Sequence, residues 1–261
     1  MIRTWPLAVV LAACGAEGSW RTEVWGEPFI EQGIPAEAFA DGCSVAFDSF
    51  VVVVSGRALV DDAGGVVASL DGAGVYDLTA SGPHEMGVVS APSGTWRGMK
   101  VTVAPEASAA AGNATADQVA AMVRREASIL VQGTLTCNDI GRSFDWAFGT
   151  ATDYACDPTN LVIPVEAAAT TQLTIHGDHL FYDSLWAEDA EVRGLALWEA
   201  DADENGSITQ EELARHEVAP YYPDGLGAFD DATNFERWLE VAAGSVGHVD
   251  GEGHCDVSRR D

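Results

Sequence analysis

The segment from Asp201 to Glu212 (DADENGSITQEE) places an oxygen ligand at each position where a coiled loop can hold a hard cation. Gly206 stands at the sixth position, where the chain must turn back and a residue that tolerates a positive φ is needed. Calcium takes six to eight oxygens at roughly 2.3–2.6 Å, so this spacing suits it. The candidate calcium ligands are Asp201, Asp203, Asn205, Ser207 through its carbonyl, Thr209 and Glu212, which offers two oxygens.

This twelve-residue pattern resembles the loop of the EF-hand calcium-binding family. Residues 188–199 and 210–217 are predicted to be the entering and exiting helices, and Ile208 is expected to point into the domain. EF-hands generally occur in pairs, whereas no other segment of this chain completes the ligand set, so the single loop must be braced by other parts of the protein. The alternative is an acidic surface loop that is merely rich in Asp and Gly.

Histidine provides a second candidate metal site. His176 and His179 occur in TIHGDH, and His248 and His254 occur in GHVDGEGHC. His176 is expected to end a strand and His179 to open a helix, with Asp183 one helical turn beyond. Imidazoles with a carboxylate suit Zn²⁺ or Cu²⁺. Alternatively, these histidines cap helices or bind backbone carbonyls.

The first residues of the chain predict export. Residues 1–13 carry one basic residue, Arg3, and an apolar run too short for the roughly twenty residues that span a bilayer. The ending Leu-Ala-Ala-Cys resembles the lipobox of bacterial lipoproteins, which implies cleavage before Cys14 and lipid attachment to it. Gly15 after the cysteine implies sorting to the outer membrane, and residues 14–21 form a short tether. A buried strand or a transmembrane helix are the alternatives.

Four further cysteines are an even number, which in an exported chain favours disulfide bonds. Three connectivities are open, of which we favour Cys43–Cys137 with Cys156–Cys255. No Cys-x-x-Cys pair occurs, so neither a zinc ribbon nor a thioredoxin-like site is predicted.

The charge of the chain excludes one class of partner. The chain has 41 acidic and 13 basic residues and a formal net charge of −28, which repels nucleic acid. The expected partners are the membrane of the cell envelope, through the lipid anchor, and a protein that the sequence does not identify.

The rest of the chain predicts a mainly β fold with some α. Between residues 22 and 176, short segments rich in Val, Thr and aromatic residues are separated by Gly, Pro and Asp, which favours an antiparallel β-sandwich. A helix is expected at 116–126. Residues 177–261 are predicted to form a helical segment that carries the EF-hand, ends in a helix at 232–243 and packs on the sandwich. The predicted strands are 43–54, 65–70, 74–79, 95–103, 128–137, 143–150 and 170–176.

Together these features favour a calcium-binding, membrane-anchored lipoprotein. The alternative is a periplasmic protein that binds or delivers copper or zinc through its histidines, and the exported, β-rich layout with late His and Cys residues resembles periplasmic copper-binding lipoproteins. The chain has no Gly-x-Ser-x-Gly, phosphate loop, dinucleotide fingerprint or His-Glu-x-x-His, so no enzymatic activity is predicted. A metal-dependent hydrolase is the third interpretation.

Overall fold

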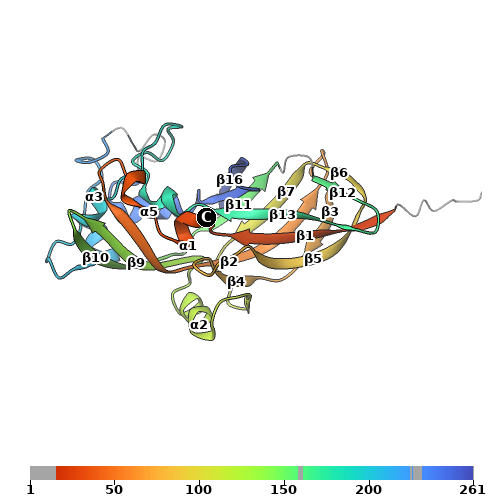
Figure 1. Ribbon diagram of the computed structural model, residues 1–261, viewed down its shortest axis with the longest axis horizontal. Helices are drawn as coiled ribbons and strands as arrows, with labels where there is room; N and C mark the ends of the chain where they lie inside the picture. Colours follow the sequence, from red (N-terminus) through yellow and green to blue (C-terminus); the bar gives the residue numbers. More distant parts are fainter. Residues whose placement is uncertain (1–15, 158–160, 224, 226–230, 261) are drawn as a thin grey trace, which may run out of the picture.

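The structure, a computed structural model, describes residues 16–157, 161–223, 225 and 231–260. The molecule is elongated and mainly β, as the sequence predicts, with two large sheets that curl along its long axis (Figure 1). Cys14 and the predicted signal peptide lie outside the described residues.

The smaller sheet contains β13, which leads into His176, and β15, which carries His248. Its order is β15-β13-β1-β5, and β1 runs parallel to β13 but antiparallel to β5. The parallel pair means that the sheets are not purely antiparallel. The bounds are β1 Glu17–Trp25, β5 His84–Pro92, β13 Ala168–Ile175 and β15 Gly247–Val249.

The larger sheet is organised around β2, a strand of 17 residues (Ser44–Val60). The first half of β2 pairs with β9 and the second half with β7, with a register shift between Ser55 and Ala58 where Gly56 has a φ of +56°. The sheet order is β14-β10-β9-β2-β7-β11-β16, and β3 and β4 also pair with β2. The bounds are β3 Val66–Leu70, β4 Gly74–Asp77, β7 Gly98–Val103, β8 Ala110–Ala111, β9 Ile129–Cys137, β10 Ile140–Phe148, β11 Ala151–Cys156, β14 Ser207–Ile208 and β16 Cys255–Arg260. A separate small sheet pairs β6 Gly94–Trp96 with β12 Leu161–Ile163.

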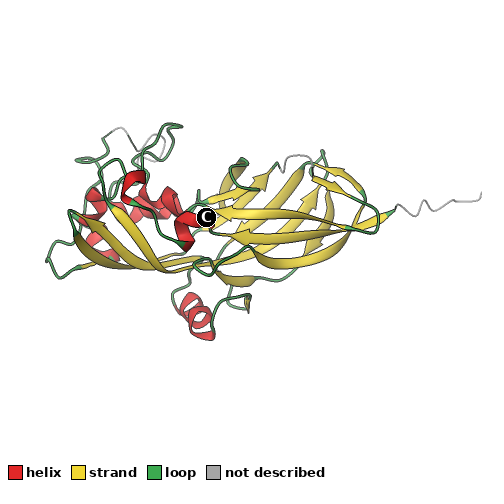
Figure 2. Cartoon of the chain, in the orientation of Figure 1, coloured by secondary structure: helices red, strands yellow, loops and turns green. Residues whose placement is uncertain are grey.

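The helices are short and most lie beside one half of the sheets, whereas α2 stands apart from them (Figure 2). Helix α2 begins with a capping box between Thr115 and Gln118 and buries Met122. The helices predicted at 188–199 and 210–217 are much shorter than expected, because α3 and α4 have four residues each. β14, β15 and β16 of the segment after residue 177 instead join the two large sheets. The bounds are α1 Glu27–Glu31, α2 Ala116–Arg124, α3 Leu195–Trp198, α4 Gln210–Leu213 and α5 Phe235–Ala243, with 3₁₀ turns η1 Ala36–Ala38 and η2 Gly177–Phe181.

The core between the sheets is closed by aromatic residues and two disulfide bonds. Trp20 and Trp146 are wholly buried, and each indole N–H donates to a buried oxygen. Both favoured cysteine pairings are confirmed, Cys43–Cys137 and Cys156–Cys255. Two disulfides are typical of a periplasmic or extracellular protein.

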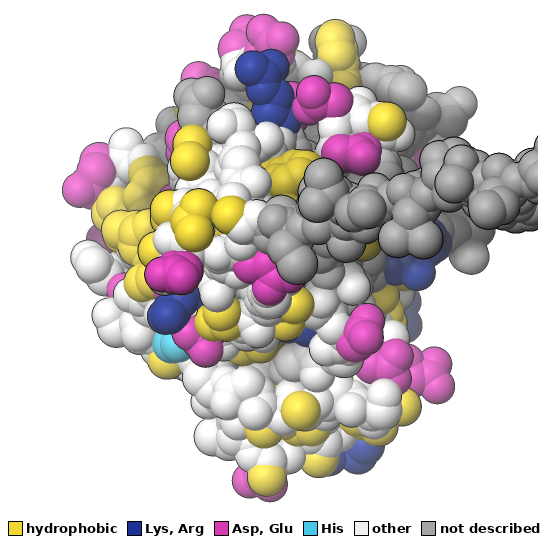
Figure 3. Space-filling model, turned by 90° about the vertical axis from the view of Figure 1, so that its right-hand side faces the viewer, with side chains coloured by type: hydrophobic (Ala, Val, Ile, Leu, Met, Phe, Trp, Pro, Cys, Tyr) yellow, Lys and Arg dark blue, Asp and Glu magenta, His cyan; other side chains and the backbone are white. Residues whose placement is uncertain are grey.

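None of the helices in the described part of the chain has the length and apolar content of a membrane span. Acidic side chains are spread over the end of the molecule shown in Figure 3, interspersed with apolar and basic ones.

Candidate metal centre

Strand register brings two of the predicted histidines together. β15 pairs antiparallel with β13 so that His248 lies opposite Thr174, two residues before His176. Side chains two residues apart on a strand share a face, and directly opposed residues share it too. The rings of His176 and His248 are therefore neighbours, with centroids 4.4 Å apart.

A 3₁₀ turn adds a third imidazole. β13 ends at Ile175, and η2 follows at once, so that Asp178 and His179 fold back beside His176. Gly177 is required by packing, because a Cβ there would come within 2.8 Å of Ile30 Cγ1 in α1. The ring of His179 lies 5.5 Å from that of His176 and 5.1 Å from that of His248. Three imidazoles bound to one ion at nitrogen–metal distances of about 2.0–2.1 Å would have centroids about 5 Å apart.

Carboxylates complete the ligand set. Two overlapping groups have ligand atoms within 4.8 Å of one another, His176 with Asp178 and His179, and His176 with His248 and Glu252. A third carboxylate, Glu27 at the start of α1, lies 3.8 Å from His176 Nε2 and has a positive φ of 56°. Residues held in such sparsely populated backbone conformations cluster at functional sites.

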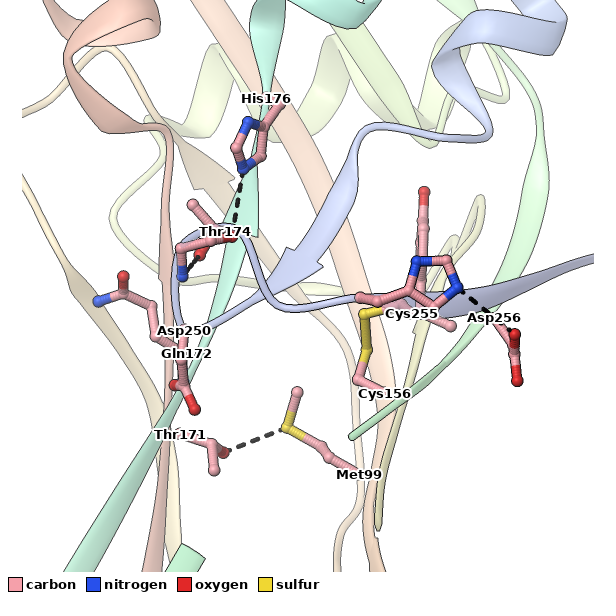
Figure 4. Close-up of a disulfide and its surroundings, with 12 residues drawn as sticks. Met99, Cys156, Thr171, Gln172, Thr174, His176, Asp250, Cys255 and Asp256 are labelled. Atoms are coloured by element: carbon pink, nitrogen blue, oxygen red, sulfur yellow. Dashed lines mark hydrogen bonds and ion pairs between the residues drawn. A yellow bond between two sulfur atoms is a disulfide. The ribbon is translucent and has the colours of Figure 1, made fainter. Parts of the chain in front are cut away.

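The turn after β15 fixes the outer side of this centre. The Gly251 N–H donates to Thr174 Oγ1 at 2.9 Å, and the Gly251 carbonyl lies 3.3 Å from His176 Nε2. Figure 4 shows the segment from Asp250 passing beside β13 towards the Cys156–Cys255 disulfide. The disulfide therefore anchors the segment that carries Glu252.

The centre keeps two of its imidazoles in the neutral, metal-binding form. Burial, reinforced by His248 and His176, lowers the pKa of His179 to about 3. Burial and His176 likewise lower the pKa of His248 to about 4. Burial raises the pKa of Asp178 and of Glu27, although His176 opposes both shifts. At neutral pH these two histidines therefore present a free lone pair, which a metal ion needs.

Two buried polar atoms of the centre have no hydrogen-bond partner among the described residues, Asp178 Oδ1 and His248 Nδ1. The other oxygen of Asp178 accepts a hydrogen bond of 3.2 Å from the Tyr182 hydroxyl. An unpaired buried acceptor costs about 1–3 kcal/mol, so each such atom calls for an explanation. A cation bound at each of these atoms would supply the missing partner.

Two of the residues predicted for this site lie elsewhere. The Asp183 carboxylate is in an ion pair with Arg193 at 2.8 Å and accepts the Glu191 N–H. The side chain of His254 is 85% exposed, and its Nε2 lies 3.6 Å from Asp256. Neither is in the two ligand groups found among the described residues.

Sequence reasoning overlooked three carboxylates of the centre. Asp178 stands between two of the histidines in TIHGDH, and Glu252 stands between His248 and His254, so spacing alone was a usable signal for both. Glu27 is about 150 residues away in the chain and has no local signal.

The acidic loop at residues 201–212 forms a compact turn. Asp201, Asp203 and Glu212 have ligand oxygens within 4.8 Å of one another. Gly206 has a φ of +86°, and its N–H donates to Asp201 at 3.0 Å. The Thr209 side chain caps α4 in a capping box with Glu212.

The loop is braced by β10, as a single loop requires. β14 pairs in parallel with β10, Ile208 is fully buried as expected, and its carbonyl accepts the Trp146 indole N–H at 2.9 Å. Asp201 is also in an ion pair with Arg142 at 3.1 Å. That guanidinium lies 3.6 Å above the ring of Trp198. A cation at Asp201 must therefore share this carboxylate with a fixed positive charge.

Comparisons with known proteins give little further information. No protein-family model matches the chain, and no curated protein matches it in sequence. Among solved structures, MbnP from Methylosinus trichosporium aligns with a TM-score of 0.36 at 11% sequence identity, over 70% of this chain and 84% of that chain. Similarity at this level assigns no function to the chain.

Proposed function

We propose that this protein binds divalent transition-metal ions, Zn²⁺ or Cu²⁺, at the centre formed by His176, His179 and His248. The observation that carries the proposal is the convergence of three imidazole rings beside Asp178. Asp178 Oδ1 and His248 Nδ1 are buried there without hydrogen-bond partners among the described residues. Imidazole nitrogens together with carboxylate oxygens are ligands that Zn²⁺ and Cu²⁺ commonly take in proteins. The four cysteines of the folded body are in disulfides, so thiolate ligands that favour Cu⁺ are not supplied by them.

The direct test is calorimetric titration of the metal-free protein with Zn²⁺ and Cu²⁺. Replacing His179 with Ala removes a ligand, so we expect the affinity to fall by at least about tenfold. His254→Ala is the matched control, because this exposed histidine lies outside the centre. Wild-type protein that binds neither ion, or equal affinities in the wild type and His179→Ala, would refute the proposal.

A second proposal, supported by the convergence of three loop carboxylates around a glycine turn, is that residues 201–212 bind calcium as a single EF-hand. The ion pair between Asp201 and Arg142 weakens the site, so we expect an affinity in the range of extracellular modules, with a Kd of about 10⁻⁴–10⁻³ M. Glu212→Gln removes the bidentate ligand and should abolish this binding. Glu211→Gln, at the exposed neighbouring position, should leave it unchanged.

A further inference from the structure

The three imidazoles and the carboxylates around them form two ligand groups rather than one. The inner group contains His176, Asp178 and His179, and the outer group contains His176, His248 and Glu252. His176 alone belongs to both, and an imidazole has two nitrogens, each of which can bind an ion once the ring has lost its protons.

The two groups differ in burial and in the elements that carry them. The inner group lies on the 3₁₀ turn η2, and Asp178 is only 9% exposed. The outer group lies on β15 and the turn that follows it, where Glu252 is exposed. Each group has one buried atom without a hydrogen-bond partner, Asp178 Oδ1 in the inner group and His248 Nδ1 in the outer group.

The charge at this centre exceeds what one divalent ion neutralises. Glu27, Asp178 and Glu252 bring three carboxylates together, and among the described residues none of them forms an ion pair with lysine or arginine. One divalent ion in the inner group would leave Glu27 and Glu252 without a cationic partner, whereas a second ion in the outer group would lie beside both.

From these observations we propose that the centre binds two divalent ions, an inner and an outer one, which share His176. The proposal rests on the proposed transition-metal function and extends it. When both ions bind, the His176 ring releases its remaining N–H proton to solvent and each ring nitrogen donates one electron pair to one ion. Glu27, which lies beside His176 Nε2 near the Gly251 carbonyl, faces the outer position.

The test counts ions and measures whether they interact. Wild-type protein is titrated with Cu²⁺ in excess calcium, which keeps oxygen-only sites occupied, and bound copper is measured by elemental analysis and electron paramagnetic resonance. We expect two copper ions per chain with a magnetically coupled spectrum, because ions that share an imidazole are close enough for their unpaired electrons to interact.

Single substitutions separate the two positions. Asp178→Asn should remove the inner ion and Glu252→Gln the outer one, so each variant should bind one copper with an uncoupled spectrum. His254→Ala should keep both ions and the coupling. One copper per chain with an uncoupled spectrum in the wild type would overturn the two-ion centre and leave the proposed function standing. No bound copper or zinc at all would overturn both.

Discussion

The imidazole of His179 occupies a position that disfavours its charged form, because burial and two neighbouring histidines lower its pKa to about 3. In the unfolded chain, histidine takes up a proton near pH 6.5. Between these two values only the unfolded state binds the proton, so the stability that His179 contributes is complete above about pH 6.5 and is lost as the pH falls.

We therefore predict that metal-free wild-type protein loses stability between about pH 7 and about pH 5, by at most about 1.4 kcal/mol per pH unit for each such histidine. His179→Gln should flatten this dependence, because the glutamine does not titrate. The measurement is urea unfolding of both proteins across that range. Parallel stability profiles would show that His179 is not held neutral by the fold.

The same pKa shifts lower the pH at which protons compete with a metal ion for His179 and His248. Free imidazole protonates near pH 6.5, whereas His179 and His248 remain neutral in the folded protein to about pH 3 and about pH 4. Protons therefore compete with a metal ion for His179 and His248 only at a lower pH than they would for a free imidazole.

Among the elements, the strands were the most predictable. The segments predicted at 128–137 and 170–176 correspond closely to β9 and β13, because alternating or continuous apolar residues bounded by turns define a strand locally. The helices at 116–126 and 232–243 were also found, as α2 and α5. β1 was assigned in part to the tether, although its Trp20 is buried in the core.

The prediction of helices after residue 177 was less accurate than that of the strands, for a physical reason. Helical spacing at 188–199 gives only the four residues of α3, because Asp183 and Arg193 bind each other and the Tyr182–Val192 bridge holds the preceding chain extended. Tertiary contacts of this kind outweigh local propensity. The grouping of His248 with His176 was foreseeable only as a clustering of histidines, since the β13–β15 pairing joins residues far apart in the chain.

β10 braces the acidic loop through the hydrogen bond from Trp146 to the Ile208 carbonyl. Trp146→Phe removes this donor and leaves a cavity, so we predict a loss of about 2–4 kcal/mol in the free energy of unfolding and a weaker calcium affinity. The matched control is Trp20→Phe.

Trp20 lies on β1, away from the acidic loop, is equally buried and donates a hydrogen bond to Thr171 at the same 2.9 Å. The Trp20→Phe substitution should lower the free energy of unfolding by a similar amount without changing the calcium affinity. Equal calcium affinities in the two folded variants would contradict the bracing role.

At the scale of the whole molecule, the two disulfides close loops of nearly equal length, with sequence separations of 94 and 99 residues. Replacing either pair by serine should therefore lower the free energy of unfolding by a similar amount, about 2–5 kcal/mol. The effects on the metal centre should differ, because Cys255 anchors the turn that carries Glu252. We predict weaker Zn²⁺ binding without Cys156–Cys255 and unchanged binding without Cys43–Cys137, measured by calorimetry. Identical affinities in the two variants would exclude this coupling.

The position of the folded body relative to a membrane depends on Cys14, which remains a proposed lipid anchor. β1 begins at Glu17, so an anchored protein would lie close to its membrane. We predict that wild-type protein fractionates with membranes and incorporates labelled palmitate, and that Cys14→Ser does neither. Equal labelling of the two proteins would rule out lipidation at Cys14.

The metal centre formed by His176, His179 and His248 is tested by X-ray absorption spectroscopy of protein loaded with one equivalent of Zn²⁺. We predict a first shell containing nitrogen at about 2.0–2.1 Å, with the outer-shell scattering of at least two imidazole rings, and loss of that imidazole signal in the variant lacking His176. A first shell of oxygen alone, without imidazole scattering, would place the ion elsewhere and contradict the account.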